Sequence, residues 1–279
     1  MIAQHENNVM ASFMLYLDNK VCTKGKAFTN YASFFNSTRK EYSSIYGYGS
    51  PFRQFVMDES ITNSPYIMTG AYLDGDPIHL GTSGFHSISH NKGHLYFTQE
   101  VTGENRLSGN FAVKDYNIYL SNDTEAEILF ETKHHTNPKI IETAKALDPE
   151  VKTFPAIFIK SASSNNEPHS YGGWDNTIMD LRCVILSDSS FSLDAVCSIL
   201  RDLSRTSVPF VQDELPFNSL GAYTGKAFNY TGIATGDGPW IDSVEISQNL
   251  GVDTYSENRS DVYSAFADFR LFDVRKPRE

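Results

Sequence analysis

The sequence predicts an α+β fold, with a β-rich N-terminal half built from hairpins or a sandwich, followed by a sheet-and-helix domain. Between residues 52 and 130, short apolar runs alternate with turns rich in Gly, Asn and Asp, which is typical of antiparallel strands. In the second half, two strand-like runs precede one amphipathic helical segment at residues 192–205. This order of strands and then a helix is typical of a sheet covered on one face.

The composition favours a packed globular protein that does not bind nucleic acid. The chain has 279 residues, of which 40% are hydrophobic and 20% charged, enough for one large domain or two ordinary ones. Its net charge is −11, and the only basic cluster is Arg275, Lys276 and Arg278. Since phosphate binding needs basic patches, we expect no stable nucleic-acid binding, although DNA can pass near such a surface.

The cysteines and the chain start indicate folding in a reducing compartment. Cys22, Cys183 and Cys197 are far apart and lack the spacing of a zinc site, so we interpret them as reduced core residues. The first residues lack the basic and apolar regions of a signal peptide. No apolar run approaches 18 residues, and no membrane partner is therefore expected.

The N-terminal half is predicted to be a loose arm followed by a series of strands. Residues 1–8 are polar, and residues 12–17 resemble a strand that enters a hairpin at Asp18 and Asn19. Residues 27–46 are compatible with a helix or with irregular structure. Strand-like runs then follow at residues 52–57, 66–73, 85–90, 94–98, 111–120 and 127–133. Asn91, Lys92 and Gly93 give the clearest hairpin turn.

A polar segment divides the chain into two predicted domains. Residues 137–152 contain Pro138 and Pro149 and leave room for one short helix at 140–147. We interpret this segment as a linker between a β-rich domain at residues 1–136 and an α+β domain at residues 153–279.

The second domain is predicted to alternate strands with one helix. Residues 154–160 form a buried strand, 161–173 a loop rich in Ser, Asn and Gly, and 177–186 a second strand. The helix at 192–205 has Ser192 as its N-cap and Asp194 in its first turn. Its apolar stripe consists of Leu193, Val196, Cys197, Leu200 and Leu203. Further strands are expected at residues 227–231, 241–247 and 262–274.

The candidate metal sites are better explained as turns. His86, His90 and His94 recur every four residues, which on one helix would suit a metal, but the turn between them favours a hairpin. Asp74-Gly75-Asp76 begins like a calcium loop, yet the twelfth position is Phe85 instead of Glu. We therefore predict no metal-binding residues.

Catalytic and cofactor motifs are not recognisable either. The glycines Gly172, Gly173, Gly232, Gly236 and Gly238 lie outside any phosphate-binding pattern, and no nucleophile elbow occurs. The carboxylate pairs Asp242 with Glu245 and Asp213 with Glu214 could serve a glycosidase, but in an acidic protein they are interpreted as solvated surface. We predict a protein that is not an enzyme, with no catalytic and no cofactor-binding residues; a polysaccharide hydrolase is the enzymatic alternative.

Several segments resemble virion structural proteins of tailed bacteriophages, especially those of marine myophage type. The resembling segments are residues 70–75, 93–98, 108–117, 154–159, 166–168 with Gly172 and Gly173, and 193–202. The second half is also similar in outline to tail-terminator and neck subunits, which as a class pair a small sheet with one or two helices and close into a ring. The N-terminal half is larger than a minimal terminator requires, so a tail-tube or baseplate component is an alternative within the class.

This resemblance implies a structural subunit that forms a homo-oligomeric ring at the head–tail junction or tail end. Its partners would be further copies of itself and other phage neck, tail and connector proteins, and it would be made in the host cytoplasm and located in the virion. We expect the contact elements at residues 1–20, 85–98 and 161–174. The alternative is a carbohydrate- or receptor-binding virion module that uses Trp174, Trp240, Tyr223 and Tyr230, with both tryptophans in loops.

Overall fold

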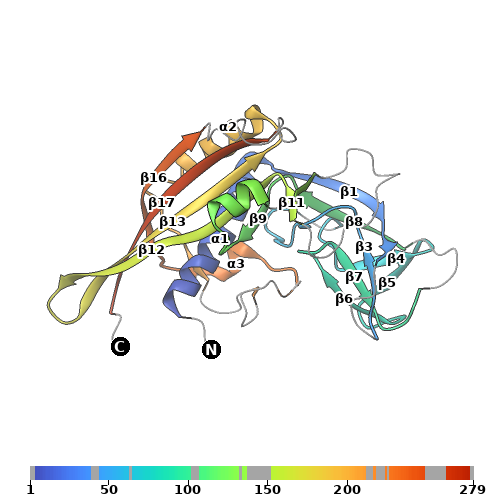
Figure 1. Cartoon of the computed structure of the whole chain (residues 1–279). Coiled ribbons are helices and arrows are strands. Elements are labelled where there is room, and N and C mark those ends of the chain that lie inside the picture. Colours follow the sequence, from blue (N-terminus) through green and yellow to red (C-terminus); the bar gives the residue numbers. More distant parts are fainter. Residues whose placement is uncertain are drawn as a thin grey trace.

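The computed structural model describes residues 4–38, 44–62, 65–101, 107–131, 134–136, 152–211, 216–217, 224, 226–248 and 262–276. It confirms the α+β class, with more strand than helix. A large sheet with two helices occupies one side of an elongated molecule, and a smaller β lobe occupies the other (Figure 1).

The large sheet contains five strands in the order β16-β17-β13-β12-β9. These are β16 (Trp240–Gln248), β17 (Tyr263–Arg275), β13 (Trp174–Ser187), β12 (Ala156–Ser170) and β9 (Asn117–Leu120). All neighbours are antiparallel except β12 and β9, which pair in parallel. The strands predicted at 241–247, 177–186 and 262–274 are confirmed, and most of the predicted 154–160 strand lies in β12.

Two helices cover one face of this sheet. Helix α1 (His5–Gly25) packs beside α2 (Ser190–Arg201), and both contribute to the largest apolar core. Phe13 of α1 meets Phe269 of β17 edge to face, with the ring centroids 4.9 Å apart. The predicted apolar stripe of α2 is confirmed as buried, but the predicted cap is wrong. The cap is Ser189, whose hydroxyl accepts a hydrogen bond from the Ser192 amide at 3.1 Å.

The predicted N-terminal arm and the strand at 12–17 are wrong, because both lie within α1 apart from the first few residues. The helix begins after Gln4, whose backbone N–H donates a hydrogen bond to the side-chain oxygen of Asn7 at 3.1 Å. Every residue from Ser12 to Asn19 is buried. A helix buried on nearly all sides has a continuous apolar run, and such a run has the same pattern as a buried strand.

The small lobe consists of two four-stranded sheets that share one aromatic core. One sheet has the order β1 (Phe28–Phe34), β8 (Leu107–Lys114), β4 (Gly70–Leu73), β5 (Asp76–His79). The other has the order β2 (Asn36–Ser37), β3 (Tyr46–Gly49), β7 (His94–Phe97), β6 (Phe85–Ser89). Aromatic side chains from both sheets and from the 50–57 segment fill the core, including Phe55 stacked on Phe111 with centroids 4.2 Å apart. The prediction of hairpins or a sandwich is confirmed here.

The turn at Asn91, Lys92 and Gly93 is confirmed between β6 and β7. Gly93 has φ +63°, and a Cβ there would lie 2.3 Å from the Phe52 carbonyl oxygen. The turn at Asp74 and Gly75 joins β4 to β5, so the turn interpretation of that acidic segment is also confirmed. Residues 27–46, left open above, contribute β1 and β2. The predicted strand at 52–57 is wrong, since only Phe55 forms a bridge, to Val113.

The remaining elements are short. They are η1 (Glu127–Glu131), a π-helical turn, β10 (His134–Thr136), β11 (Lys152–Phe154), β14 (Phe210–Val211), α3 (Tyr230–Ile233) and β15 (Ala234–Gly236). The strands predicted at 127–133 and 227–231 are therefore largely wrong, since η1 and α3 begin there. The predicted linker and its short helix lie outside the described residues, except for Lys152. Two elements from residues 1–136, α1 and β9, belong to the large sheet layer.

Candidate functional site

A long exposed β-hairpin projects from the described part of the chain; we call it the arm and define it as residues 161–174. It extends β12 and β13 away from the body of the protein (Figure 1). All 14 of its residues are exposed, whereas Ala156–Ile159 of the same strand β12 are fully buried against β9 and β13. The loop predicted at 161–173 is therefore wrong except for its turn.

The arm is a paired strand despite its loop-like composition. Its partners on β13 run in register from Ser163 opposite Asp180 to Ser170 opposite Trp174. The Thr177 hydroxyl donates to the Asn166 side chain at 2.8 Å across the two strands. Serine and asparagine are usual in loops because their side chains bond to the local backbone, whereas here the side chains of Ser163 and Asn166 bond across the hairpin to Asp180 and Thr177.

Contacts at the base hold the arm in place. Strand β17 pairs with β13 as far out as Arg275 opposite Asp175, and the Arg275 Nε donates to the Thr177 hydroxyl at 2.7 Å. On the other strand, the Ser164 hydroxyl donates to Glu6 of α1 at 2.5 Å. The lower half of the arm is thus part of a three-stranded ribbon, which stiffens it.

Apolar side chains concentrate at the outer end of the arm. Tyr171 is fully exposed at the turn, where Gly172 and Gly173 have positive φ angles of +98° and +82°. Trp174 is 41% exposed and has the Lys276 ammonium 5.4 Å from its ring centroid. Val274, on the neighbouring strand, is also exposed. Exposed apolar groups gathered in this way mark surfaces that contact a partner.

The aromatic set expected for carbohydrate binding is only partly assembled. Trp240 is the first residue of β16 and not a loop residue; it is paired with Phe272 of β17 and is about half exposed. Trp174 begins β13 and shares the outer face of the sheet with Trp240 by strand register. Tyr230 is the first residue of α3 and is buried, so it is not available to a ligand. Tyr223 lies outside the described residues.

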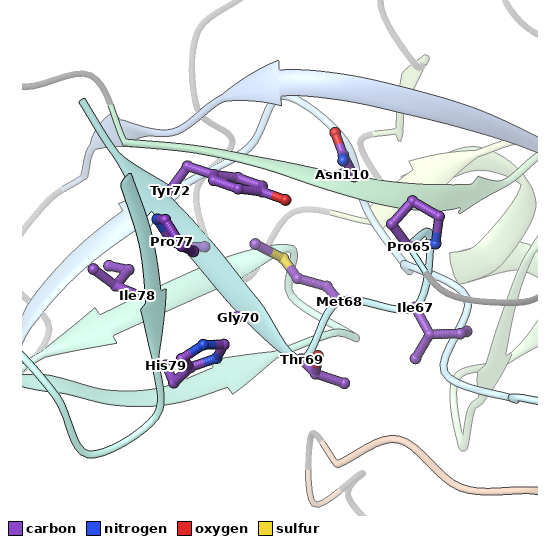
Figure 2. A pocket seen from close by; sticks show the side chains of 11 residues that line it. Pro65, Ile67, Met68, Thr69, Gly70, Tyr72, Pro77, Ile78, His79 and Asn110 are labelled. Carbon is purple, nitrogen blue, oxygen red and sulfur yellow. The ribbon is translucent and has the colours of Figure 1, made fainter. Parts of the chain in front are cut away.

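A pocket of about 140 Å³ lies at the opposite end of the molecule, on the outer face of the β4–β5 hairpin. Figure 2 shows Tyr72 and Pro77 on one side of it and Pro65 and Asn110 on the other. The buried side chain of Met68 contributes to its apolar lining. None of the described residues that line it is a carboxylate. The pocket therefore offers ring and proline surfaces with a few polar groups, which suits an aromatic side chain better than an acid–base reaction.

The three histidines do not converge. His86 is exposed and hydrogen-bonds Ser87 at 3.1 Å, whereas His90 is buried with its Nε2 2.8 Å from the Met68 carbonyl oxygen. His94 is buried in β7. Over the described parts of the chain, no group of three His, Cys, Asp or Glu residues has the arrangement needed to hold a metal ion.

Arg182 of β13 is the centre of an ion-pair network on the large sheet. Arg182 binds Asp268 through two bonds of 2.6 and 2.9 Å and reaches Glu125 at 2.8 Å. These hydrogen bonds, chiefly those that Arg182 donates to Asp268, raise the pKa of the Arg182 guanidinium. Glu245 lies opposite Asp268 in register, and Asp242 sits at the bulge of β16. The pair Asp213 and Glu214 lies outside the described residues.

The three cysteines are buried, and their thiols are unreactive. Cys22, Cys183 and Cys197 are free thiols, as predicted. Burial raises the pKa of each of them, which keeps the thiol protonated and unreactive at neutral pH.

A buried polar cluster that the sequence did not reveal joins the two halves of the molecule. The Lys114 ammonium of β8 lies 2.7 Å from the Asp18 carboxylate of α1, and both side chains are almost fully buried. Nearby, Asp58 accepts hydrogen bonds from the Asn19 amide at 3.0 Å and from the Tyr230 backbone at 2.9 Å. Burial raises the pKa of Asp18, and the charge of Lys114 opposes that shift. Because the members of this cluster are far apart in the sequence, the sequence shows each polar residue but does not show that they pair.

Comparison with protein-family models and with curated proteins gave no match. Among the described helices, none combines the length and the apolar character required to cross a membrane.

Proposed function

We propose that this protein is a structural subunit of a tailed-phage virion, which assembles with copies of itself into a ring at the head–tail junction or tail end. The virion setting follows from the resemblance of segments such as residues 70–75 and 108–117, and the observation that carries the self-assembly is the arm. A hairpin of 14 exposed residues that ends in an exposed aromatic side chain has little to bury against within its own chain. Such hairpins are stabilised when they pack on a neighbouring subunit.

The surface chemistry supports a contact function. A standard protein interface involves about 20 to 30 residues per side and about 800 Å² per partner. The arm, together with Val274 and Lys276 beside it, supplies a large part of one such side. Aromatic residues are enriched in the centres of interfaces, and Tyr171 and Trp174 fit that role.

The other two predicted contact elements, residues 1–20 and 85–98, are less suited to a contact because their large apolar side chains are mostly buried. Residues 1–20 are mostly the buried helix α1, so they serve the core of the subunit and we no longer propose them as a contact. Residues 85–98 form the β6–β7 hairpin, in which the aromatic residues Phe85 and Phe97 are buried and stacked on each other. The arm at 161–174 is the element that we retain.

The experiment that tests this function measures the assembly state of the full chain. We expect the mass from light scattering to rise with concentration from about 1 to 100 μM, and negative-stain images to show closed rings. The concentrations bracket the affinities of weak to moderate interfaces. A particle that remains monomeric at the highest concentration contradicts the proposal.

A matched pair of variants separates the arm from general exposed aromatic surface. Trp174→Ala, on the arm, should shift assembly to higher concentration. Phe191→Ala should not, although Phe191 is 84% exposed, because it lies at the start of α2 away from the arm. Equal effects from both variants would argue against a specific role for the arm.

A second candidate function is the binding of a carbohydrate or receptor at a tail tip or baseplate. The observation that favours it is that Trp174 and Trp240 are exposed on the same face of the sheet, where sugar rings can stack. Glycan-array binding that disappears in Trp240→Ala but persists in Phe191→Ala is expected in that case. Binding that is indifferent to Trp240 would exclude this site.

A further inference from the structure

We propose that the ring contact is a knob-in-hole contact, in which Tyr171 of one copy inserts into the β4–β5 pocket of the next copy. This inference rests on the proposed self-assembly and specifies its geometry. The partner is a second copy of this chain, and the occupant of the pocket is a phenol ring.

The size of the pocket matches an aromatic ring. Its volume is about 140 Å³, and a cavity of about 150 Å³ is known to be large enough to hold benzene. Tyr72, Pro65 and Pro77 line it with flat surfaces against which a ring can pack (Figure 2). Asn110 and His79 provide polar groups near its edge that can bond the hydroxyl of an inserted tyrosine.

The knob has the properties that such a pocket requires. Tyr171 is completely exposed in the isolated chain, which leaves a large apolar ring in water. Its position at the end of a paired hairpin reduces the conformational entropy that is lost on binding. Tyrosine is also one of the residue types that contribute most to interface affinity.

Exposed apolar side chains lie around the pocket and can form further parts of the contact. Phe34 and Tyr72 both lie opposite Ser108, on the two sides of β8, so their side chains share the face that carries the pocket. Both are exposed, as is Leu80 just beyond β5. At the other end, Trp174 and Val274 flank the knob. Exposed apolar side chains thus accompany both the knob and the hole.

The placement of knob and hole dictates the symmetry of the assembly. The arm and the β4–β5 hairpin lie at opposite ends of the molecule, so one chain cannot fill its own pocket (Figure 1). A contact between two different surfaces is heterologous, and it produces a ring if the rotation closes or a filament if it does not. This agrees with a ring; two copies that fill each other's pockets would instead form a closed two-fold dimer, which the mass from light scattering distinguishes from a ring.

Complementary variants test the inference directly. Tyr171→Ala removes the knob and keeps the hole, whereas Thr69→Trp fills the hole from an exposed position in its lining and keeps the knob. Each variant alone should need about tenfold or more protein to assemble, as expected for a central aromatic contact. Mixed in equal amounts, the two should form a one-to-one heterodimer, because one intact knob still meets one intact hole. Tyr171→Phe keeps the ring and should assemble within about threefold of wild type.

The outcomes separate this inference from the proposed function. If the wild type assembles and either variant assembles equally well, the knob-in-hole contact is wrong while self-assembly stands. If both variants stay monomeric when mixed, the contact is not heterologous and the inference is again wrong. If the wild type itself remains monomeric up to about 100 μM, the proposed function fails and the inference fails with it. Circular dichroism of each variant should match that of the wild type, which shows that the fold is retained.

Discussion

Replacement of Lys114 by methionine is expected to destabilise the protein strongly at neutral pH. The Lys114 Nζ lies 2.7 Å from Asp18 Oδ2, and the two side chains are 1% and 4% exposed. Methionine has a similar volume and no charge, so the packing is retained while Asp18 loses its counter-ion. Removing one partner of a buried pair costs about 3–5 kcal/mol, since it leaves an uncompensated charge in the interior.

The loss of stability in Lys114→Met is limited by the free energy of protonating Asp18, and it therefore depends on pH. The ordinary pKa of its carboxyl is 3.8, so protonating it costs about 4.4 kcal/mol at pH 7 but only about 1.6 kcal/mol at pH 5. The variant can escape the charge penalty by taking up that proton. We therefore expect a loss of about 3–4 kcal/mol at pH 7 and of less than about 2 kcal/mol at pH 5.

Urea unfolding followed by circular dichroism at both pH values measures this effect. The double variant Asp18→Asn/Lys114→Met removes both charges, and it should regain most of the stability that the single variant loses. A loss below about 1 kcal/mol at pH 7, or one that is the same at both pH values, would refute the reasoning.

Three further predictions concern local features of the fold. Ser189→Ala should lower the free energy of unfolding by about 1 kcal/mol, because Ser189 caps α2. Ser192→Ala, which keeps this cap, should lower it by less than half as much. The midpoints of urea unfolding of the two variants measure the difference. Gly93→Ala should lower the free energy of unfolding by more than about 1 kcal/mol, because the new Cβ would overlap the Phe52 carbonyl. Gly75→Ala should lower it less, because Gly75 is also at positive φ but faces open space. Equal melting temperatures for the two variants would contradict this. Burial raises the pKa of Asp18 in the folded state above its unfolded value, so the stability that the Asp18 carboxyl contributes should fall as the pH rises from about 4 through the folded pKa. This decline in unfolding free energy should be absent from Asp18→Asn. A wild type that instead gains stability relative to Asp18→Asn over this pH range would contradict the prediction.

The arm shows where composition misleads. Residues 161–170 are rich in serine and asparagine and contain Pro168, and each of these features favours a loop. They form a strand because β13 offers a complete register of partners and is itself held by β17. The information for this strand lies in the apolar pattern of residues 174–187 and in the β17 sequence, and not in the segment itself.

The pocket could not be predicted from any local pattern. Its walls come from the 65–69 segment, the β4–β5 hairpin and Asn110 of β8. The sequence identified Asp74 and Gly75 as a turn, and that turn does bring Tyr72 and Pro77 into register. The approach of Pro65 and Asn110 depends on how β8 pairs with β4 across a long separation in the chain.

The sequence by itself determined the fold class, the main hairpin turns, the amphipathic face of α2 and the reduced state of the cysteines. These follow from local periodicity and from the backbone preferences of Gly, Asn and Ser, which act over a few residues. Only the tertiary structure decided that residues 12–17 belong to a helix, since an apolar run buried on all sides carries no period. It alone also brought Asp18 and Lys114, 96 residues apart, into one ion pair and placed the arm and the β4–β5 hairpin at opposite ends of the molecule. Contacts between distant segments depend on the packing of whole elements, which a local pattern does not encode.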